Sequence, residues 1–444
     1  MRKYITRTNF VLVTLMLVLT LPGTALASPK ESGESAPLSL PSQVLSSLAI
    51  GPGLDNLSLS NRYATYQWGL KNDGEFRLVR MTSSFRSLDS VYGGRKGRSS
   101  SISLPDLGPG MIEHQSTVIT AAQGMDINIL PAWKQYDETP PEQKRPVIVA
   151  VIDTGIDYSH PELANAMWTN PLEIPGDGID NDGNGFIDDV HGWNFYTGSP
   201  TLYSGTEDSH GTHTAGTIAA AREFGGVAGI TDNRYVKLMC LKALGGPYGI
   251  GSPGTVVQAI HYAEANGASI CNLSLGSSAF NEELAQAIQN SNMLFVIACG
   301  NGDTDGNGYD IDVNPIYPAG LPYDNVISVA SLQFDGNLAP SSNYGAASVD
   351  IAAPGSYILS TAPGNSYAFM SGTSMAAPMV TGVAAMVYSC RTDLALSDVK
   401  NALLSSARPL ESLTGKVTSG GLLNAYAALN YGLTAPDPAF SPAP

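Results

Sequence analysis

The sequence contains five short runs in which almost every residue is apolar. They cover residues 146–153, 236–244, 268–276, 294–300 and 325–332. Apolar residues at successive positions indicate strands that are buried on both faces, as in a parallel sheet covered by helices. The pattern therefore predicts the interior strands of an α/β fold.

Between and after these runs, apolar residues recur at helical spacing. Four such segments lie at 254–267, 281–291, 396–407 and 422–432. The first of them ends at Gly267, a residue type that favours helix C-caps. Strands that alternate with helices predict a doubly wound α/β sheet, in which ligands bind at the carboxyl ends of the strands.

The first 27 residues have the pattern of an export signal. A basic stretch precedes a mainly apolar run of twelve residues at 10–21, and an A-x-A cleavage site ends at Ala27. Twelve residues are too few to cross a bilayer, which requires about 20. We therefore expect a signal peptide at 1–27 and a secreted protein, with an uncleaved anchor as the alternative.

Changes in composition suggest the remaining boundaries. Residues 28–58 are rich in Ser, Pro and Leu, which indicates a spacer or a short propeptide. Residues 59–117 form an N-terminal segment whose Gly, Ser and basic residues at 93–103 predict an exposed loop. The α/β pattern occupies 118–432, and the tail at 433–444 is rich in proline.

The net charge limits the possible partners. The chain has 23 Lys and Arg against 39 Asp and Glu, a formal charge of −16 at pH 7. This balance argues against nucleic acid as a partner and against stable association with anionic membranes. An acidic surface is compatible with an exported protein that binds cations.

The four cysteines leave the disulfide state open. Cys240, Cys271 and Cys299 lie inside apolar runs, where buried free thiols are an alternative to bridges, and the fourth is Cys390. The sequence has no C-x-x-C spacing of the kind that zinc and redox sites use.

Three residues could together activate a nucleophile. Asp153 ends the first apolar run, His210 precedes an Ala-rich helical pattern, and Ser374 begins an apolar helical pattern. A serine hydroxyl needs a base to take its proton, and the imidazole needs a carboxylate to fix its tautomer. Each residue alone is more often a turn former or a helix cap. Their combination predicts a Ser-His-Asp triad.

The segments around these residues resemble the three active-site signatures of the subtilisin-like serine peptidases, or subtilases. VAVIDTGID (149–157), HGTHTAG (210–216) and GTSMAAP (372–378) match the Asp, His and Ser motifs of the family. The resemblance extends from about Gly124 to Tyr431. It implies a doubly wound, seven-stranded parallel sheet flanked by helices.

The same resemblance implies an activity and its residues. The expected reaction is hydrolysis of peptide bonds in polypeptide substrates through an acyl-enzyme, by a monomer. Asp153 would orient the base, His210 would act as general base and acid, and Ser374 would be the nucleophile. Asn301 matches the oxyanion-hole asparagine of the family, whereas on its own it would be read as a turn residue.

Two further segments resemble the substrate-lining segments of subtilases. They comprise Ser274, Leu275 and Gly276, and Ala298, Cys299 and Gly300. Their main chains would pair with an extended peptide, a mode of binding that predicts broad sequence specificity. Cys299 would lie beside the first specificity pocket, with a buried core thiol as the alternative.

The resemblance does not settle whether the protein has a propeptide that is removed. YQWGLKNDG (66–74) resembles the segment at the start of the mature region in subtilases. Only the short stretch 28–58 then remains for a propeptide, where many subtilases carry a folded domain. Either that domain is missing or residues 28–117 serve as an unusual one, with 93–98 as a candidate cleavage region.

Other classes of protein fit less well. A nucleophile elbow requires G-x-S-x-G, whereas the motif around Ser374 ends in Ala376. Serine-carboxyl peptidases would have a glutamate in place of His210. A catalytically inactive subtilase is disfavoured by the intact motifs, and a calcium-dependent surface module would require repeats or an anchor.

An acidic loop at 176–189 predicts a calcium site between the Asp and His motifs. Oxygen-bearing side chains at alternate positions before Gly185 form the first half of an EF-hand-like loop. His191 stands where an EF-hand would end in glutamate, so a nearby aspartate must serve instead. The expected ligands are Asp180, Asp182, Asn184, the carbonyl of Phe186, and Asp188 or Asp189. A solvated turn is the alternative, and 303–312 repeats the spacing.

Overall fold

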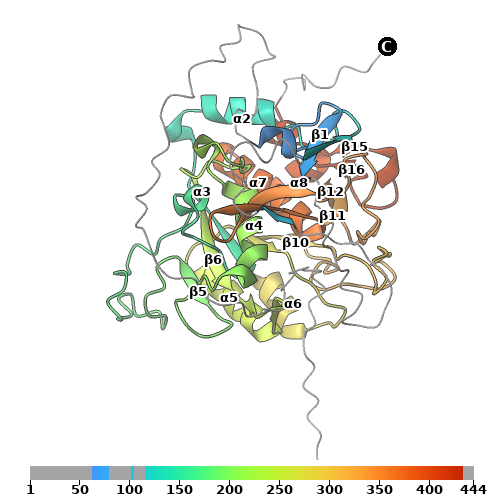
Figure 1. Cartoon of the computed structure of the whole chain (residues 1–444). Helices are drawn as coiled ribbons and strands as arrows, with labels where there is room; N and C mark the ends of the chain where they lie inside the picture. Colours follow the sequence, from blue (N-terminus) through green and yellow to red (C-terminus); the bar gives the residue numbers. More distant parts are fainter. Residues whose placement is uncertain (1–62, 80–101, 105–115, 434–444) are drawn as a thin grey trace, which may run out of the picture.

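The computed structural model describes residues 63–79, 102–104 and 116–433. Helices flank a central sheet, and the N-terminal segment packs near the C-terminal strands (Figure 1). The predicted signal peptide, spacer, cleavage region at 93–98 and most of the tail lie outside the described residues. The corresponding domain boundaries therefore stay predictions.

The central sheet has nine strands in the order β15-β16-β12-β11-β10-β9-β4-β6-β5. The seven strands from β5 to β12 are all parallel. In sheet order they are β5 (Gly192–Asn194), β6 (Val236–Lys242), β4 (Val147–Asp153), β9 (Ile270–Leu273), β10 (Leu294–Ala298), β11 (Val326–Leu332) and β12 (Ile351–Pro354). The predicted seven-stranded, doubly wound sheet is confirmed.

Two very short strands extend this sheet beyond β12. β16 (Gly421–Leu422) is parallel to β12, and β15 (Arg408–Pro409) is antiparallel to β16. The predicted helix at 422–432 is consequently shorter, because its first residue pairs in the sheet. The helix that forms there, α9 (Ala425–Leu429), is capped by the side chain of Asn424.

The remaining helices match the predicted positions closely where a prediction was made. The α-helices are α2 (Ile129–Glu138), α3 (Pro161–Ala164), α4 (Ser209–Ala219), α5 (Pro253–Ala265), α6 (Glu282–Asn290), α7 (Thr373–Cys390) and α8 (Leu396–Ser405). Short 3-10 helices occur at η2 (Ala64–Tyr66), η4 (Pro141–Gln143), η5 (Thr206–Asp208), η6 (Arg222–Phe224) and η7 (Glu411–Leu413). A capping box at Ser252 starts α5.

Helix α7 forms the centre of the core. Among the described helices it alone is long and apolar enough to cross a membrane, but 89% of that stretch is buried inside the fold. It packs on the strands from β6 to β12 and against α4, so it is the core helix of this domain. The four cysteines are free, and three of them are buried in this core.

Small antiparallel sheets surround the central one. β1 (Glu75–Val79) pairs with β3 (Ser116–Thr120), and β7 (Leu244–Gly245) pairs with β8 (Ile250–Gly251). β13 (Ile358–Ala362) and β14 (Ser366–Met370) form a hairpin that β2 (Ile102–Leu104) joins. The hairpin leads directly into α7.

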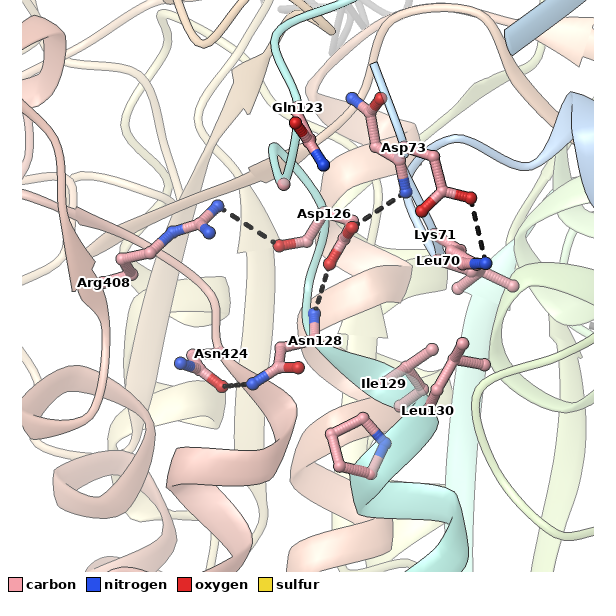
Figure 2. Close-up of a pocket in the computed structure, with 13 residues that line it drawn as sticks. Leu70, Lys71, Asp73, Gln123, Asp126, Asn128, Ile129, Leu130, Arg408 and Asn424 are labelled. Carbon is pink, nitrogen blue, oxygen red and sulfur yellow. Dashed lines mark hydrogen bonds and ion pairs between the residues drawn. The ribbon is translucent and has the colours of Figure 1, made fainter. Parts of the chain in front are cut away.

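Residues 63–79 of the N-terminal segment pack against the central domain. Trp68 is buried and donates from its indole N–H to the Ser356 carbonyl at 2.8 Å. A pocket of about 340 Å³ lies where this segment meets α2 and the C-terminal strands (Figure 2). There the Asp126 carboxylate accepts hydrogen bonds from the backbone N–H groups of Asn72 and Asn128. The pocket contains none of the predicted site residues.

Candidate active site

The three predicted triad residues lie at the carboxyl end of the parallel sheet. Asp153 ends β4. The strands that follow β4 in the sequence lie on both sides of it in the sheet, β5 and β6 on one side and β9 on the other. Such a topological switch point commonly forms a ligand-binding site. His210 lies in the first turn of α4, and Ser374 lies in the first turn of α7. Three segments distant in the sequence thus converge.

Asp153 and His210 form a buried pair. The Nδ1 atom of His210 lies 2.8 Å and 2.9 Å from the two carboxylate oxygens of Asp153. A carboxylate can only accept here, so Nδ1 carries the hydrogen and Nε2 has a free lone pair. Thr154 supports the arrangement, because its hydroxyl accepts from the Gly211 N–H at the start of α4. The imidazole is thereby oriented as a base.

The acceptor atom of His210 and the hydroxyl of Ser374 are not hydrogen-bonded to each other. His210 Nε2 is buried and has no hydrogen-bond partner, while Ser374 donates to the Ser274 carbonyl at 3.3 Å. A buried polar atom without a partner costs about 1–3 kcal/mol and is typical of functional sites.

Asn301 is held through its side-chain oxygen. Its Oδ1 accepts from the Thr373 N–H at 2.8 Å and from the Thr373 hydroxyl at 3.1 Å. Because a backbone N–H requires an acceptor, this contact fixes which end of the amide is oxygen. Gly372 has φ +150°, and a Cβ there would lie 3.1 Å from Asn301 Oδ1, so glycine permits this approach.

The two predicted substrate-lining segments meet beside the nucleophile. β9 and β10 are adjacent and parallel, and Ser274 donates from its hydroxyl to the Ser374 carbonyl at 3.0 Å. Cys299 is fully buried, and its thiol donates to the Asn343 carbonyl at 3.1 Å. Burial raises the pKa of this thiol to about 12. Its side chain therefore lies in the core, as the alternative interpretation of Cys299 expected.

A buried ion pair beside the triad was not anticipated from the sequence. Lys242 ends β6 directly opposite Asp153 in the strand register. Its ammonium group donates to Asp208 at 2.5 Å, to Glu207 at 2.8 Å and to the Ser204 hydroxyl at 3.3 Å. A lysine that ends an apolar run, and an aspartate two residues before His210, were the available signals.

Burial and hydrogen bonding shift the pKa values of both Asp208 and Lys242. Burial raises the pKa of Asp208 to about 6, although the hydrogen bond from Lys242 acts in the opposite direction. Burial also opposes the charge on Lys242, but its hydrogen bonds to Asp208 and Glu207 outweigh that effect and raise its pKa. The pair lies where η5 leads into α4, so it holds the segment that carries His210.

His213, the second histidine of the HGTH motif, has a structural role. Burial lowers the pKa of His213 to about 4, so this imidazole is neutral at pH 7. Its Nε2 donates to the carbonyls of Ile358 at 2.9 Å and Ala368 at 3.2 Å, one on each strand of the β13–β14 hairpin. His213 therefore fastens α4 to the hairpin that precedes Ser374.

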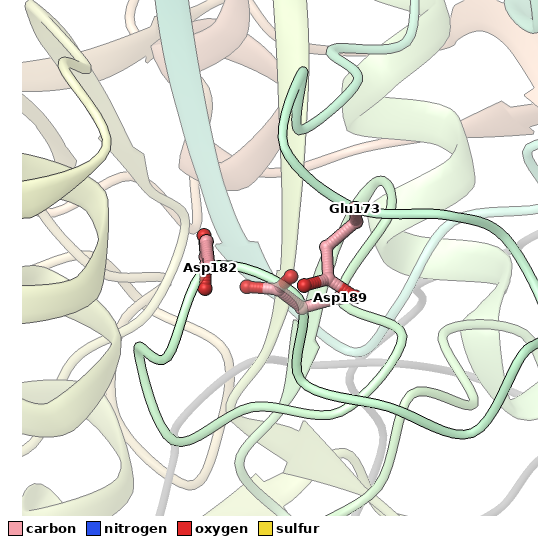
Figure 3. A group of neighbouring side chains, drawn as sticks. All are labelled: Glu173, Asp182 and Asp189. Carbon is pink, nitrogen blue, oxygen red and sulfur yellow. The ribbon is translucent and has the colours of Figure 1, made fainter.

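The acidic loop brings three carboxylates together, one of which lies before the predicted segment. Ligand oxygens of Glu173, Asp182 and Asp189 all lie within 4.8 Å of one another (Figure 3). Asn170 donates to Asp182 at 3.0 Å and to Asp189 at 2.9 Å, and the Tyr262 hydroxyl donates to Asp189 at 2.5 Å. Oxygen donors of this kind are the ligands that calcium prefers. Sequence reasoning missed Glu173 because it precedes the alternating motif.

The other predicted ligands mainly organise the loop backbone. Asp180 accepts from the N–H groups of Asn184 and Gly185, and the Asn184 side chain accepts from the Phe186 N–H. Asp188 accepts from the N–H groups of Gly176 and Gly178 at the other end of the loop. Among the described residues, no lysine, arginine or histidine nitrogen lies within 4.0 Å of the carboxylates at 173–189.

The second acidic run, at 303–312, has no comparable cluster. Asp303 accepts from the N–H groups of Asp305 and Asn307, within its own turn. Asp312 accepts from the N–H groups of Ala347 and Ser348. Within the described part of the chain, only the group at 173–189 places three potential metal-ligating side chains together.

Comparison with known proteins identifies the family of this chain. The model of the Subtilase family (Peptidase_S8) matches residues 144–428. Subtilisin-like protease 1 of Plasmodium falciparum is 35% identical over 301 residues, which cover 64% of this chain and 43% of the parasite protein. This chain thus spans less than half of the parasite protein's length.

Two bacterial relatives are matched over most of their length. The major intracellular serine protease of Bacillus subtilis is 33% identical over 332 residues, 72% of this chain and 92% of that protein. Thermitase of Thermoactinomyces vulgaris is 34% identical over 287 residues, 64% of this chain and 88% of that protein. The family match, the parallel sheet and the convergent motifs agree, and the chain belongs to the subtilase family.

Proposed function

We propose that this protein is a secreted serine endopeptidase that cleaves polypeptides through an acyl-enzyme. The observation that carries the proposal is the buried His210, whose Nδ1 is paired with Asp153 and whose Nε2 has no partner. A base in this state is ready to accept a proton from Ser374, which lies in the first turn of α7.

In the proposed mechanism, the Ser374 side chain turns from the Ser274 carbonyl to His210 Nε2. Its oxygen attacks the scissile carbonyl carbon while His210 takes the proton, and Asp153 stabilises the resulting imidazolium. His210 then gives this proton to the leaving amine. Water, deprotonated by the same imidazole, hydrolyses the acyl-enzyme and restores Ser374.

Negative charge develops on the carbonyl oxygen during both steps. The amide nitrogen of Asn301 and the backbone N–H of Ser374 are the proposed donors to that oxygen. The N-terminus of α7 adds positive potential at the same place. Loss of one such donor typically lowers the rate by about 10²–10³-fold.

Substrate would bind as an extended strand along 274–276 and 298–300. Main-chain pairing reads few side chains, so we propose broad specificity at most positions. Export follows from the signal-peptide pattern at 1–27, and the acidic net charge fits an extracellular monomer.

We further propose one structural calcium ion in the acidic loop. Glu173, Asp182 and Asp189 would supply its carboxylate oxygens, and loop oxygens near Asp180 and Asn184 could complete its coordination. The ion would offset like charges that are close together and have no cationic side chain beside them. It would order the loop and take no part in the reaction.

The decisive test is hydrolysis by the purified mature protein and by its Ser374→Ala variant. Casein and a fluorogenic peptide would be the substrates, with and without calcium. We expect the variant to lose about 10⁴-fold or more of kcat/KM while keeping its circular dichroism spectrum. Equal rates in both proteins would contradict the proposed mechanism.

The alternative is an inactive subtilase that binds peptides without cleaving them. No hydrolysis by either folded protein would favour it, unless cleavage near residues 93–98 restored activity. Activity that appears only after such cleavage would identify a zymogen instead.

A further inference from the structure

Asn301 lies between two glycines with left-handed backbone angles. Gly300 has φ +102° and Gly302 has φ +88°. Glycine adopts such angles without strain, but it also loses more conformational freedom on folding than any other residue. The backbone at 300–302 therefore requires contacts from other segments if the Asn301 amide is to keep one position.

Asn343 supplies such contacts on both sides of Asn301. Its side-chain Nδ2 donates to the Cys299 carbonyl at 3.1 Å, and its Oδ1 accepts from the Gly302 N–H at 3.1 Å. Its backbone N–H donates to the Gly300 carbonyl at 3.0 Å, while the Cys299 thiol donates to the Asn343 carbonyl at 3.1 Å. One residue thus holds the chain immediately before and immediately after Asn301.

The side-chain amide of Asn343 has a single orientation. Its Oδ1 also accepts from the Tyr309 N–H at 3.1 Å. Two backbone donors and one backbone acceptor therefore agree on which end of the amide is oxygen. Asn343 is 1% exposed, and a Cβ added at Gly300 would lie 2.6 Å from its Nδ2, so the amide is packed closely against this segment.

Asn343 is itself anchored to the central sheet. Its carbonyl accepts from the Ser342 hydroxyl at 2.9 Å. The same hydroxyl accepts from the Ser331 N–H on β11, also at 2.9 Å. Because β11 is paired with β10, the strand that leads into Cys299, the position of Asn343 relative to the segment at 300–302 is set by the sheet.

We propose that Asn343 is a positioning residue for Asn301, the proposed donor to the oxyanion. The inference rests on the proposed peptidase function, because it concerns the place where negative charge develops in that reaction. A donor of this kind acts only within about 2.7–3.1 Å of the developing oxyanion. Loss of the Asn343 contacts would release the two glycines and displace the amide, and a misplacement of about 1 Å can lower a rate about 10²-fold.

The test compares Asn343→Ala in the presence and in the absence of Asn301. We expect Asn343→Ala to lower kcat on a fluorogenic peptide by about 10–100-fold and to change KM by less than about threefold. In the Asn301→Ala background the same change should lower kcat by less than about threefold, since effects on one functional unit are not additive. An unchanged kcat, or an equal loss in both backgrounds, would overturn the proposal.

Asn325→Ala is the matched control. The side-chain Nδ2 of Asn325 also bridges backbone segments, because it donates to carbonyls at the amino ends of the strands, opposite the catalytic edge: those of Ile288, Ser291 and Met293. Its replacement should lower kcat by less than about threefold. A loss as large as that of Asn343→Ala would contradict a specific role for Asn343.

Asn343→Asp maintains the test if the alanine variant does not fold. It keeps an acceptor for the Gly302 N–H and replaces only the donor to the Cys299 carbonyl. Its loss of kcat should therefore be smaller than that of Asn343→Ala, and it should likewise disappear in the Asn301→Ala background. A loss that persists undiminished without Asn301 would overturn the proposal.

Inhibitor binding gives a readout that a general loss of stability would not move. A peptide aldehyde forms a tetrahedral adduct with Ser374, whereas the matching peptide alcohol does not. We expect either Asn343 variant to bind the aldehyde at least about tenfold more weakly and the alcohol as tightly as the wild-type protein does. Equal weakening of both inhibitors would contradict an action through Asn301.

The same experiments separate this proposal from the proposed function. Hydrolysis that depends on Ser374 but is unaffected by Asn343→Ala would refute the role of Asn343 and leave the peptidase function intact. Absence of hydrolysis by the wild-type protein, together with no effect of Ser374→Ala, would refute the peptidase function itself.

Discussion

The catalytic edge of the sheet and the acidic loop at 173–189 both gather carboxylates, but they balance the charge differently. At the catalytic edge, Asp153 faces His210, and Asp208 faces the buried ammonium group of Lys242. In the loop, the donors are backbone N–H groups, the Tyr262 hydroxyl and the side-chain amides of Asn170, Asn181 and Asn184. The first region contains its own cationic partners, whereas the second has only neutral donors among the described residues.

The difference fits the role proposed for each region. The proposed general base must keep one orientation through every cycle, and its supporting charges come from side chains fixed by the sheet. A surface loop can take its counter-charge from solvent, and then its order depends on the cation concentration. Changes to the catalytic edge should therefore act at any calcium concentration, and changes to the loop only where calcium binds.

The largest expected effect comes from Lys242→Met. It leaves Asp208 buried without its partner, and breaking a buried pair in this way typically costs about 3–5 kcal/mol of unfolding free energy. Urea unfolding in the Ser374→Ala background, which prevents self-digestion, would measure this cost. The double variant Lys242→Met, Asp208→Asn should recover most of it.

Lys237→Met provides the matched control for Lys242→Met. Lys237 lies on the same strand, and its ammonium group donates to the Asn165 carbonyl in an exposed position. Its replacement should cost less than about 1 kcal/mol. Equal costs for the two lysines would show that the buried pair is not what supports this edge.

A smaller effect is expected from Asp189→Asn in the loop. At free calcium about 100-fold above its Kd, a bound ion adds about 2.7 kcal/mol of stability, and this variant should lose that gain. Thermal unfolding with calcium and with a chelator, again in the Ser374→Ala background, would measure it. Asp303→Asn, in the second acidic run, should respond to calcium like the parent. A calcium response that survives Asp189→Asn would contradict the proposed site.

The smallest expected effect is on how the unfolding free energy depends on pH. The contributions of Asp208 and of Asp180 to this dependence have opposite signs. Burial raises the folded-state pKa of Asp208 to about 6, so its contribution is greatest below its unfolded pKa near 4 and is lost as pH rises through 6. Hydrogen bonds from Gly185 and its neighbours lower the pKa of Asp180, whose contribution is instead lost as pH falls.

Comparison of the parent with Asp208→Asn would isolate the first of these contributions. Between pH 4 and 6 the unfolding free energy of the parent should fall by about 2 kcal/mol more than that of the variant. Urea unfolding at a fixed calcium concentration would measure both slopes. Identical slopes would mean that folding leaves the pKa of Asp208 unchanged, which would contradict the predicted shift.

Local sequence patterns predicted most of the fold. The five apolar runs correspond to β4, β6, β9, β10 and β11, because burial on both faces requires apolar residues at successive positions. Strands β5 and β12 were missed, since their three and four residues are not part of a longer apolar run. The helix expected at 422–432 lost its start to β16, a pairing that depends on a strand far away in the sequence.

The candidate site likewise contains residues that local motifs predicted and residues that they did not. The motifs around Asp153, His210 and Ser374 identified the family because each is a continuous stretch with a fixed chemical requirement. Sequence patterns did not predict Glu173 and Lys242, because their partners are many residues away and no local spacing links them.

The sequence by itself therefore determined the fold class, the family and the three segments that carry the proposed triad. Only the tertiary structure decided that His210 and not His213 faces Asp153, and that Glu173 joins Asp182 and Asp189. The physical reason is that hydrophobic periodicity and short motifs are local. Contacts between distant segments depend on the order and register of the strands, which no single stretch of sequence contains.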